Sequence, residues 1–193
     1  MVRRTRADME ETRTTLLKTA RQVFSEHGYA ETSMDDLTAL AGLTRGALYH
    51  HFGDKKGLLT AVVAQIDAEM DTRLQVISDS TDNAWEAFRD RCRMYLEMAQ
   101  EPEIQRIVLR DARAVLGNSP PEAHRHCAAS LQKMLEQLML QETVVQTDPE
   151  ALAMLIHGAL CEAAFWIAEA EPGSDRLLQA LGALELLLKG VRS

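Results

Sequence analysis

The five prolines of this 193-residue chain lie between its apolar stretches and never inside one. Because proline lacks a backbone amide donor and clashes with the preceding helical turn, a helical chain confines it to helix starts and loops. Between the prolines, apolar residues recur every three or four positions, as on one face of an α-helix; the longest run is Leu59, Val62, Val63, Ile66, Met70 and Leu74. No stretch alternates with a period of two, and no Asn-Gly or Asp-Gly hairpin turn occurs. The sequence therefore predicts an all-α fold of about nine helices.

Several helix starts are marked by residues that can satisfy the unpaired amides of a first turn. Residues 119–122 (Ser-Pro-Pro-Glu) form a capping box with proline at the first helical position, and Asp148-Pro149 marks another start. Ser33 with Asp36 is a variant of the same box in which aspartate replaces glutamate. These signals place helix starts where the apolar periodicity also begins.

Charge is distributed unevenly along the chain. The sequence carries 21 Lys+Arg and 29 Asp+Glu, a net charge of −8, which taken alone argues against a nucleic-acid partner. Residues 1–58 carry nine basic and eight acidic side chains, whereas residues 59–193 carry twelve and twenty-one. Because no Pro/Gly linker interrupts the chain near residue 58, we expect an N-terminal domain of residues 1–53 and a larger domain of residues 54–193, joined by a helix from about residue 54 to 77.

The composition excludes several other classes of protein. With 46% apolar and 26% charged residues, the chain is not intrinsically disordered. Three cysteines, at positions 92, 127 and 161, do not make a disulfide framework, and no apolar signal-peptide segment follows the basic N-terminus. We expect a soluble, cytoplasmic protein.

Residues 33–52 have the pattern of a helix-turn-helix. Ser33 caps a short helix whose Leu37 and Leu40 are expected to point inward. Gly42 suits the left-handed turn, Thr44 caps the next helix, and Leu48 and Phe52 are the buried positions of that helix, as expected for a unit that places its second helix in the DNA major groove. A generic helical corner in a larger bundle is the alternative.

The remaining positions of the second helix suit contact with DNA. Arg45 lies at its N-terminal end and can bridge guanine O6 and N7. Gly46 and Ala47 lack bulk, so the backbone can approach the groove and Ala47 can meet a thymine methyl group. Tyr49 and His50 follow one turn later, within reach of phosphate oxygens. At the next helix start, Lys55 and Lys56 add cations beside amides that favour phosphate.

The N-terminus is basic. Arg3, Arg4 and Arg6 form either a solvated tail or an arm that enters the minor groove of DNA.

This region resembles the TetR (tetracycline-repressor) family of bacterial transcriptional regulators. The matching residues lie within about residues 10–60: Gly28-Tyr29, Thr32-Ser33, Ala41 to Thr44, Gly46 to Phe52, Lys55 and Leu58. The resemblance implies an all-helical homodimer with three N-terminal helices for DNA, a fourth helix linking them to a ligand-binding domain, and two final helices that pair with the dimer mate. It also implies DNA contacts at Ser33, Thr44, Arg45, Gly46, Ala47, Tyr49, His50 and Lys55. Asp35 departs from the family pattern, because some relatives carry a basic DNA-contacting residue there.

Two apolar stretches near the C-terminus permit two interpretations. Residues 151–168 and 177–188 could form a membrane hairpin, but the first contains His157 and Glu162 and the second contains Gln179 and Glu185. Small residues that allow close helix approach favour a four-helix dimer interface instead: Gly158, Ala159, Ala163, Ala180, Gly182 and Ala183. We therefore expect a homodimer and no membrane partner.

An effector pocket is expected among the central helices. Aromatic and aliphatic side chains at helical spacing could line it, although such residues are often simply core: Trp85, Phe88, Cys92, Tyr95, Met98, Ile107, Leu131, Met134 and Trp166. Arg110-Asp111 and His157 could orient a ligand, or could be an internal ion pair and a core histidine.

Neither a metal site nor an active site is expected. His124, His126 and Cys127 do not converge on one helix face, and no second ligand cluster accompanies them. No nucleophile elbow, phosphate loop or metalloprotease motif is present. We expect no cofactor and no enzymatic activity.

The function expected from these observations is repression of transcription. A dimer would bind a palindromic, double-stranded DNA operator, and a small-molecule effector would release it by shifting the helix of residues 54–77. The alternatives are a helical ligand-binding protein or enzyme that has the fold without sequence-specific DNA binding, and a protein-binding adaptor.

Overall fold

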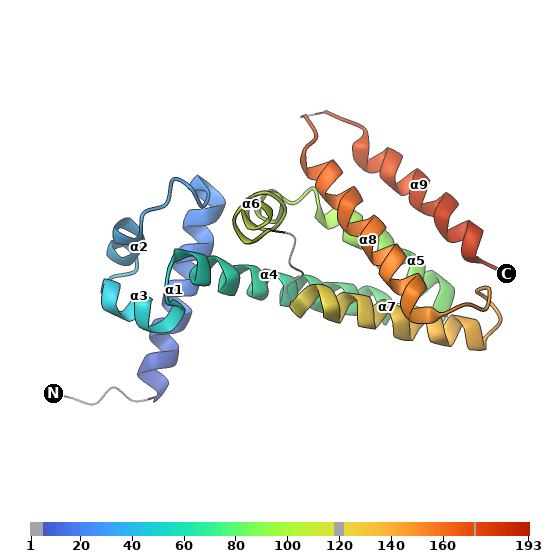
Figure 1. The fold of residues 1–193 in the computed structure, drawn as a ribbon, viewed down its shortest axis with the longest axis horizontal. Helices are drawn as coiled ribbons and strands as arrows, with labels where there is room; N and C mark the ends of the chain where they lie inside the picture. The colour runs from blue at the N-terminus through green and yellow to red at the C-terminus, as the bar shows by residue number, and fades with distance from the viewer. Residues whose placement is uncertain (1–5, 118–121, 172) are drawn as a thin grey trace. The chain divides into compact units, whose positions relative to one another are not determined.

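The computed structural model describes residues 6–117, 122–171 and 173–193, without the side chains of residues 122–126. In this part of the chain there are nine α-helices and one π-helix (Figure 1), which confirms the predicted all-α class. The helices are α1 (Arg6–His27), α2 (Met34–Leu40), α3 (Arg45–Phe52), α4 (Lys55–Ser78), α5 (Ala84–Met98), the π-helix η1 (Ile104–Ala112), α6 (Arg113–Leu116), α7 (Glu122–Leu140), α8 (Pro149–Ala168) and α9 (Arg176–Val191). Among the described residues, β pairing is limited to an isolated bridge between Val144 and Arg192.

The chain divides into two compact units. The first comprises residues 1–66 and 106–119, and the second comprises residues 67–105 and 120–193. Helix α4 begins in the first unit and ends in the second. This division into compact units does not test the functional boundary predicted between residues 53 and 54, which stays a prediction.

The core of the first unit forms where α1, α2 and α3 pack against one another. Its fully buried residues are Leu16, Ala20, Phe24, Leu37, Leu48, Leu58, Leu59 and Val62. Leu40, which was expected to point inward, is 69% exposed, because it lies at the end of α2 and the packed side of that helix carries Leu37 and Thr38. Ala47, expected on an exposed face, is buried, because α3 packs against both α1 and α2 and so buries a wider arc.

Hydrogen bonds confirm three of the predicted helix starts. The Ser33 hydroxyl accepts from the Asp36 amide at 3.0 Å and donates to the Asp36 carboxylate at 2.6 Å. Thr44 Oγ1 accepts from an amide in the first turn of α3 at 3.2 Å, and Asp148 caps α8 in the same way at 2.8 Å. The capping box of residues 119–122 lies outside the described residues.

Gly57 in the first turn of α4 is a position where only glycine fits. A Cβ placed there would collide with the Phe52 carbonyl oxygen, which is backbone and cannot rotate away. We expect Gly57→Ala to lower the free energy of unfolding by about 1–3 kcal/mol, the usual cost of overpacking, measured by chemical denaturation. The control is Gly46→Ala in α3, whose Cβ would meet only Thr44 Oγ1 at 3.9 Å. The free energy of unfolding of this control variant should rise by up to about 1 kcal/mol, because alanine has a higher helix propensity than glycine. Equal effects at the two sites would contradict the steric explanation.

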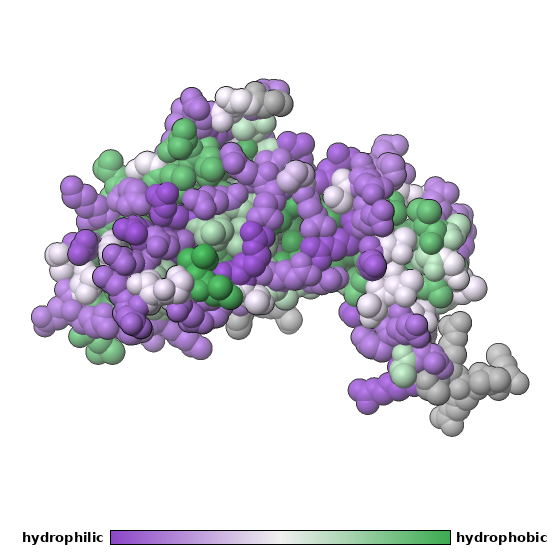
Figure 2. Space-filling view, turned by 180° about the vertical axis from the view of Figure 1, so that it is seen from behind, coloured by the Kyte–Doolittle hydropathy of each residue, from purple (hydrophilic) through white to green (hydrophobic). Residues whose placement is uncertain are grey.

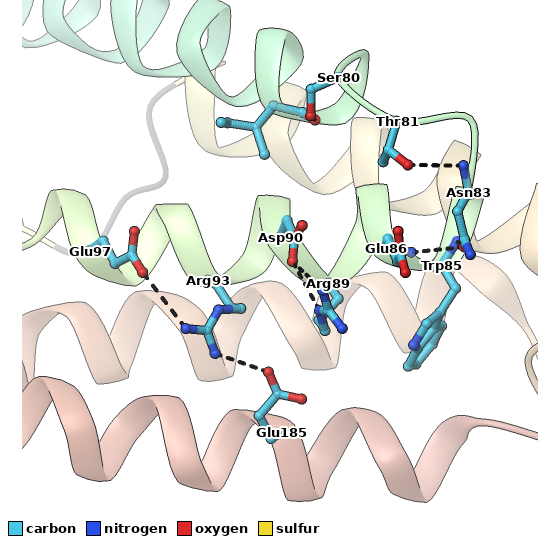
Figure 3. Close-up of polar contacts among 11 residues, drawn as sticks. Ser80, Thr81, Asn83, Trp85, Glu86, Arg89, Asp90, Arg93, Glu97 and Glu185 are labelled. Carbon is cyan, nitrogen blue, oxygen red and sulfur yellow. Dashed lines mark hydrogen bonds and ion pairs between the residues drawn. The ribbon is translucent and has the colours of Figure 1, made fainter.

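The second unit is a bundle of α5, α7, α8 and α9 in which α8 packs against the other three. Its buried core includes Phe88, Cys92, Leu96, Leu135, Leu138, Ile156, Leu160 and Leu188. Asn83 caps α5 through its side-chain oxygen, 3.0 Å from the Trp85 amide. Figure 3 shows Arg93 reaching from α5 to Glu185 of α9 at 3.0 Å, so an ion pair also joins these two helices.

Candidate nucleic-acid interface

The exposed side of α3 carries most of the residues predicted to contact DNA. Arg45, Gly46, Tyr49 and His50 are all exposed, and their spacing (i, i+1, i+4, i+5) puts them on one face of the helix. The turn before α3 forms as expected, with Gly42 in the left-handed region at φ 65°. The structure therefore presents a continuous polar face of the second helix of the motif to solvent.

Arg45 is held by Asp35 of the preceding helix. Arg45 Nη1 lies 3.1 Å from Asp35 Oδ1, and its guanidinium carbon lies 6.0 Å from the centre of the Tyr49 ring. Hydrogen bonding to Tyr49 and the nearby Asp35 carboxylate raise the pKa of Arg45 above its usual value. The sequence indicated only that Asp35 stands where some relatives carry a basic DNA-contacting residue. The structure shows that it also pairs with the arginine that is predicted to contact a base.

We expect Asp35→Asn to reduce discrimination between specific and random DNA. Exposed ion pairs contribute up to about 1 kcal/mol and the proposed dimer has two of them, so the ratio of the two affinities should fall by up to about 30-fold. Affinity for random DNA should rise, because a negative charge is removed. Fluorescence anisotropy at one salt concentration measures both affinities. Asp36→Asn is the control, since it removes the same charge from α2 without contacting Arg45; an identical effect would show that charge alone matters.

Contacts within the fold already involve Lys55 and an amide of the first turn of α4. Lys55 Nζ lies 4.3 Å from the centre of the Tyr29 ring and 3.4 Å from the Ala30 carbonyl oxygen. Burial lowers the pKa of Lys55, partly opposed by nearby carboxylates. Asp54 Oδ1 accepts from the Gly57 amide at 2.6 Å, so a carboxylate already occupies one of the amides expected to favour phosphate.

The other predicted contacts differ in their placement. Thr44 and Ser33 are exposed, but the Ser33 hydroxyl is bonded to Asp36. Ala47 is buried at 8% exposure, so its side chain is not free to meet a thymine methyl group. Arg6 is exposed in the first turn of α1, whereas Arg3 and Arg4 lie outside the described residues.

Two side chains of η1 form hydrogen bonds with the turn between α1 and α2. The sequence did not predict these contacts. Arg106 Nη2 donates to the His27 carbonyl oxygen at 2.7 Å, and the Tyr29 amide donates to Asp111 Oδ2 at 2.7 Å. Gly28 between them has φ 83°, and a Cβ there would lie 2.5 Å from Arg106 Nη2. Asp111 thus supports the helix-turn-helix unit instead of orienting a ligand. No local sequence pattern links positions about 80 residues apart.

The residues expected to line a pocket are dispersed. Phe88 and Met98 are fully buried, Trp85, Tyr95 and Met134 are half-buried, His157 is buried, and Trp166 is 40% exposed. Arg110 is exposed and belongs to the first unit, not to the bundle that holds the others.

A polar cluster does form inside the second unit. Tyr95 Oη lies 3.3 Å from Cys161 Sγ, which lies 3.5 Å from His157 Nε2. Sequence reasoning missed the charged residues of this unit: Asp67, Asp71 and Arg91. Their signal was a spacing of four, which puts Asp67 with Asp71 and Arg91 with Tyr95 on shared helix faces.

No group of three or more His, Cys, Asp or Glu residues in the described part of the chain is arranged to hold a metal ion. The side chains of His124 and His126 lie outside that part.

Comparison with known proteins finds two family models that match this chain. Residues 16–62 match the family model described as "Bacterial regulatory proteins, tetR family", and residues 85–191 match the one described as "Tetracyclin repressor-like, C-terminal domain". The chain belongs to the TetR family of transcriptional regulators. Its helix-turn-helix is therefore the DNA-binding motif of that family.

Individual relatives agree with this assignment. A TetR-family transcriptional regulator from Pectobacterium atrosepticum is 69% identical, with a TM-score of 0.91 and 98% of each chain covered. TtgR, a transcriptional regulator from Pseudomonas putida, is 39% identical over 82 residues, which are 42% of this chain and 39% of TtgR. The TetC protein of transposon Tn10 from Escherichia coli is 27% identical over 74% of this chain and 73% of TetC. The chain thus matches less than half the length of TtgR.

Proposed function

We propose that this TetR-family protein is a repressor that binds a palindromic operator as a homodimer and is released from it by a small-molecule effector. The observation that carries the proposal is the exposed face of α3, where Arg45 stands at the N-terminal end, followed one turn later by Tyr49. In helix-turn-helix proteins that end of the second helix contacts base edges. The DNA contacts proposed for each subunit are Ser33, Thr44, Arg45, Gly46, Tyr49, His50 and Lys55.

The homodimer is supported by exposed apolar residues on α8 and α9. Large side chains at least 50% exposed there are Met154, Leu155, Leu178, Leu186 and Leu187. Exposed small residues lie between them, including Gly158, Ala159 and Gly182, and would allow close helix approach. Figure 2 shows hydrophobic patches within a mostly hydrophilic surface on one face of the molecule. Burial of such side chains against a second copy is favourable.

A membrane is the competing partner for α8. This helix has a mean hydropathy of 1.7 and is long and apolar enough to span a bilayer by those criteria alone. It also carries Glu162 on its exposed side and buries His157 inside the bundle, which suits a protein interface better than lipid. We therefore propose a cytoplasmic protein whose α8 faces a second copy and not a bilayer.

Release by an effector follows from the continuity of α4. Its first half belongs to the unit that carries α3, and its second half, from Asp67, belongs to the bundle. A ligand that binds better to one position of the second half will shift the population of that position in both subunits. At saturation the ligand can change operator affinity at most by the ratio of its affinities for the two positions of α4.

The test uses the DNA upstream of the protein's own gene. Wild-type protein is titrated against any inverted repeat found there and against a scrambled duplex of equal length and composition. We expect specific binding at least about 1,000-fold tighter than binding to the scrambled duplex. Equal affinity for the two duplexes, together with binding of small molecules, would favour the alternative of a ligand-binding protein that has the fold without sequence-specific DNA binding.

A further inference from the structure

Polar side chains converge inside the second unit from α4, α5 and α8. Asp67 of α4 lies close enough to Tyr95 of α5 and Cys161 of α8 to help raise the pKa of both groups. Tyr95 Oη and Cys161 Sγ are 3.3 Å apart. The three helices therefore gather a carboxylate, a phenol and a thiol in one place.

The Asp67 carboxylate is the exceptional member of this group. Its Oδ2 is buried and has no hydrogen-bond partner. Burial raises its pKa from 3.8 to about 6 and is the sole cause of the shift. With a pKa near 6 the group is mostly ionised at neutral pH, although a buried carboxylate oxygen without a partner is costly.

The neighbours of Asp67 leave its charge unbalanced. Arg91 Nη2 lies 2.8 Å from Asp71 Oδ1, so these two opposite charges offset each other. Burial raises the pKa of Cys127 to about 11 and that of Tyr95 well above 10, so both groups remain neutral. Among the side chains described in this cluster, Asp67 carries the negative charge that lacks a partner.

The cluster is also accessible. Asp67, Tyr95, Cys127 and Cys161 all retain solvent-accessible surface, although burial is the main cause of every one of their pKa shifts. These side chains can therefore be reached from solvent, whereas Asp67 Oδ2 itself is covered by its neighbours. Met134 lies two turns after Cys127 on the same face of α7 and is also half-buried, which adds an apolar side chain to the cluster.

We propose that this cluster is a ligand site for an organic cation, a protonated amine or an amidinium on an apolar body. The N–H groups of the ligand donate to Asp67 Oδ2 when the side chains that cover this atom move aside. Such a ligand supplies both the hydrogen bond and the opposite charge that Asp67 lacks. A neutral alcohol supplies only the hydrogen bond, and a carboxylate ligand would be repelled. The effector role of this ligand rests on the proposed function, whereas its binding to the cluster does not depend on that function.

The probes are benzylammonium, benzyl alcohol and benzoate, which have the same ring and differ in charge. Isothermal titration and thermal unfolding are run on wild-type protein, on Asp67→Asn, and on Glu69→Gln as the control that removes a carboxylate from an exposed position of α4. We expect benzylammonium to bind wild-type protein and Glu69→Gln at least tenfold tighter than the alcohol, and Asp67→Asn to lose that preference. Asp67→Asn should also raise the Tm of the free protein at neutral pH, because it removes a buried charge.

Each outcome has a separate meaning. The proposal is overturned if benzylammonium does not bind up to millimolar concentration, if it binds no tighter than the alcohol, if Asp67→Asn binds it unchanged, or if that variant lowers the Tm. Operator binding is measured on the same samples with sodium chloride at matched ionic strength. If benzylammonium binds through Asp67 without weakening operator binding, the ligand site stands and the effector role fails. If no operator is bound at all, the proposed function fails and the ligand site is unaffected.

Discussion

Replacement of Arg45 by alanine is expected to weaken binding to the operator by about 30-fold to 20,000-fold. A bidentate arginine–guanine contact is worth about 1–3 kcal/mol, and the proposed dimer makes it twice. At 1.4 kcal/mol for each factor of ten, the summed loss of about 2–6 kcal/mol gives this range. Alanine retains the helix, and Arg45 is exposed, so the fold should be unaffected. Fluorescence anisotropy with the inverted repeat measures the loss.

Specificity distinguishes base contact from simple charge attraction. Arg45→Ala should lose its preference at one base-pair position in each half-site, which a set of singly substituted duplexes reveals. Lys18→Ala removes one exposed positive charge from α1 of the same unit and serves as the control. If both variants lose the same affinity, and lose it equally on scrambled DNA, then Arg45 contacts phosphate and another residue determines the sequence preference.

Leu155→Glu combined with Leu186→Glu should convert the proposed dimer into a monomer. These side chains are 73% and 74% exposed in the single chain, so the substitutions spare its core. In the dimer each leucine would lose about 1.5–3 kcal/mol of burial, and each glutamate would add a desolvation cost of several kcal/mol. The dissociation constant should therefore rise by more than about 1,000-fold, measured by analytical ultracentrifugation, and operator affinity should fall with it.

The control for the dimer interface is Leu140→Glu. Leu140 at the end of α7 is 85% exposed but belongs to neither α8 nor α9. This variant should remain dimeric. A dimeric Leu155→Glu/Leu186→Glu protein beside a monomeric Leu140→Glu protein would place the interface on another surface.

Local signals in the sequence predicted the features that depend on a few neighbouring residues. The caps at Ser33, Thr44 and Asp148 formed because each side chain bonds an amide three positions away. The left-handed turn at Gly42 likewise depends on the residue itself. For the same reason α4 begins within a residue of its expected start.

Contacts between helices could not be predicted in this way. Ala47 is buried because two helices pack against α3. The spacing of apolar residues along α3 does not indicate how many helices pack against it. The pairing of Asp35 with Arg45 and the unpaired state of Asp67 likewise depend on which faces meet. Asp35 was noted only as a departure from the family pattern, and none of the charged residues of the internal cluster was singled out, so the ion pair with Arg45 and the cluster were missed.

The contacts that η1 makes with the turn between α1 and α2 limit how the DNA-binding part of this protein can be exchanged. Arg106 and Asp111 bond the His27 carbonyl and the Tyr29 amide from a segment far along the chain. A chimaeric regulator made by joining residues 1–66 to the remainder of a distant homologue would therefore leave both backbone groups without their partners. Swapping operator preference between two such proteins requires transplanting positions 106 and 111 together with the N-terminal helices.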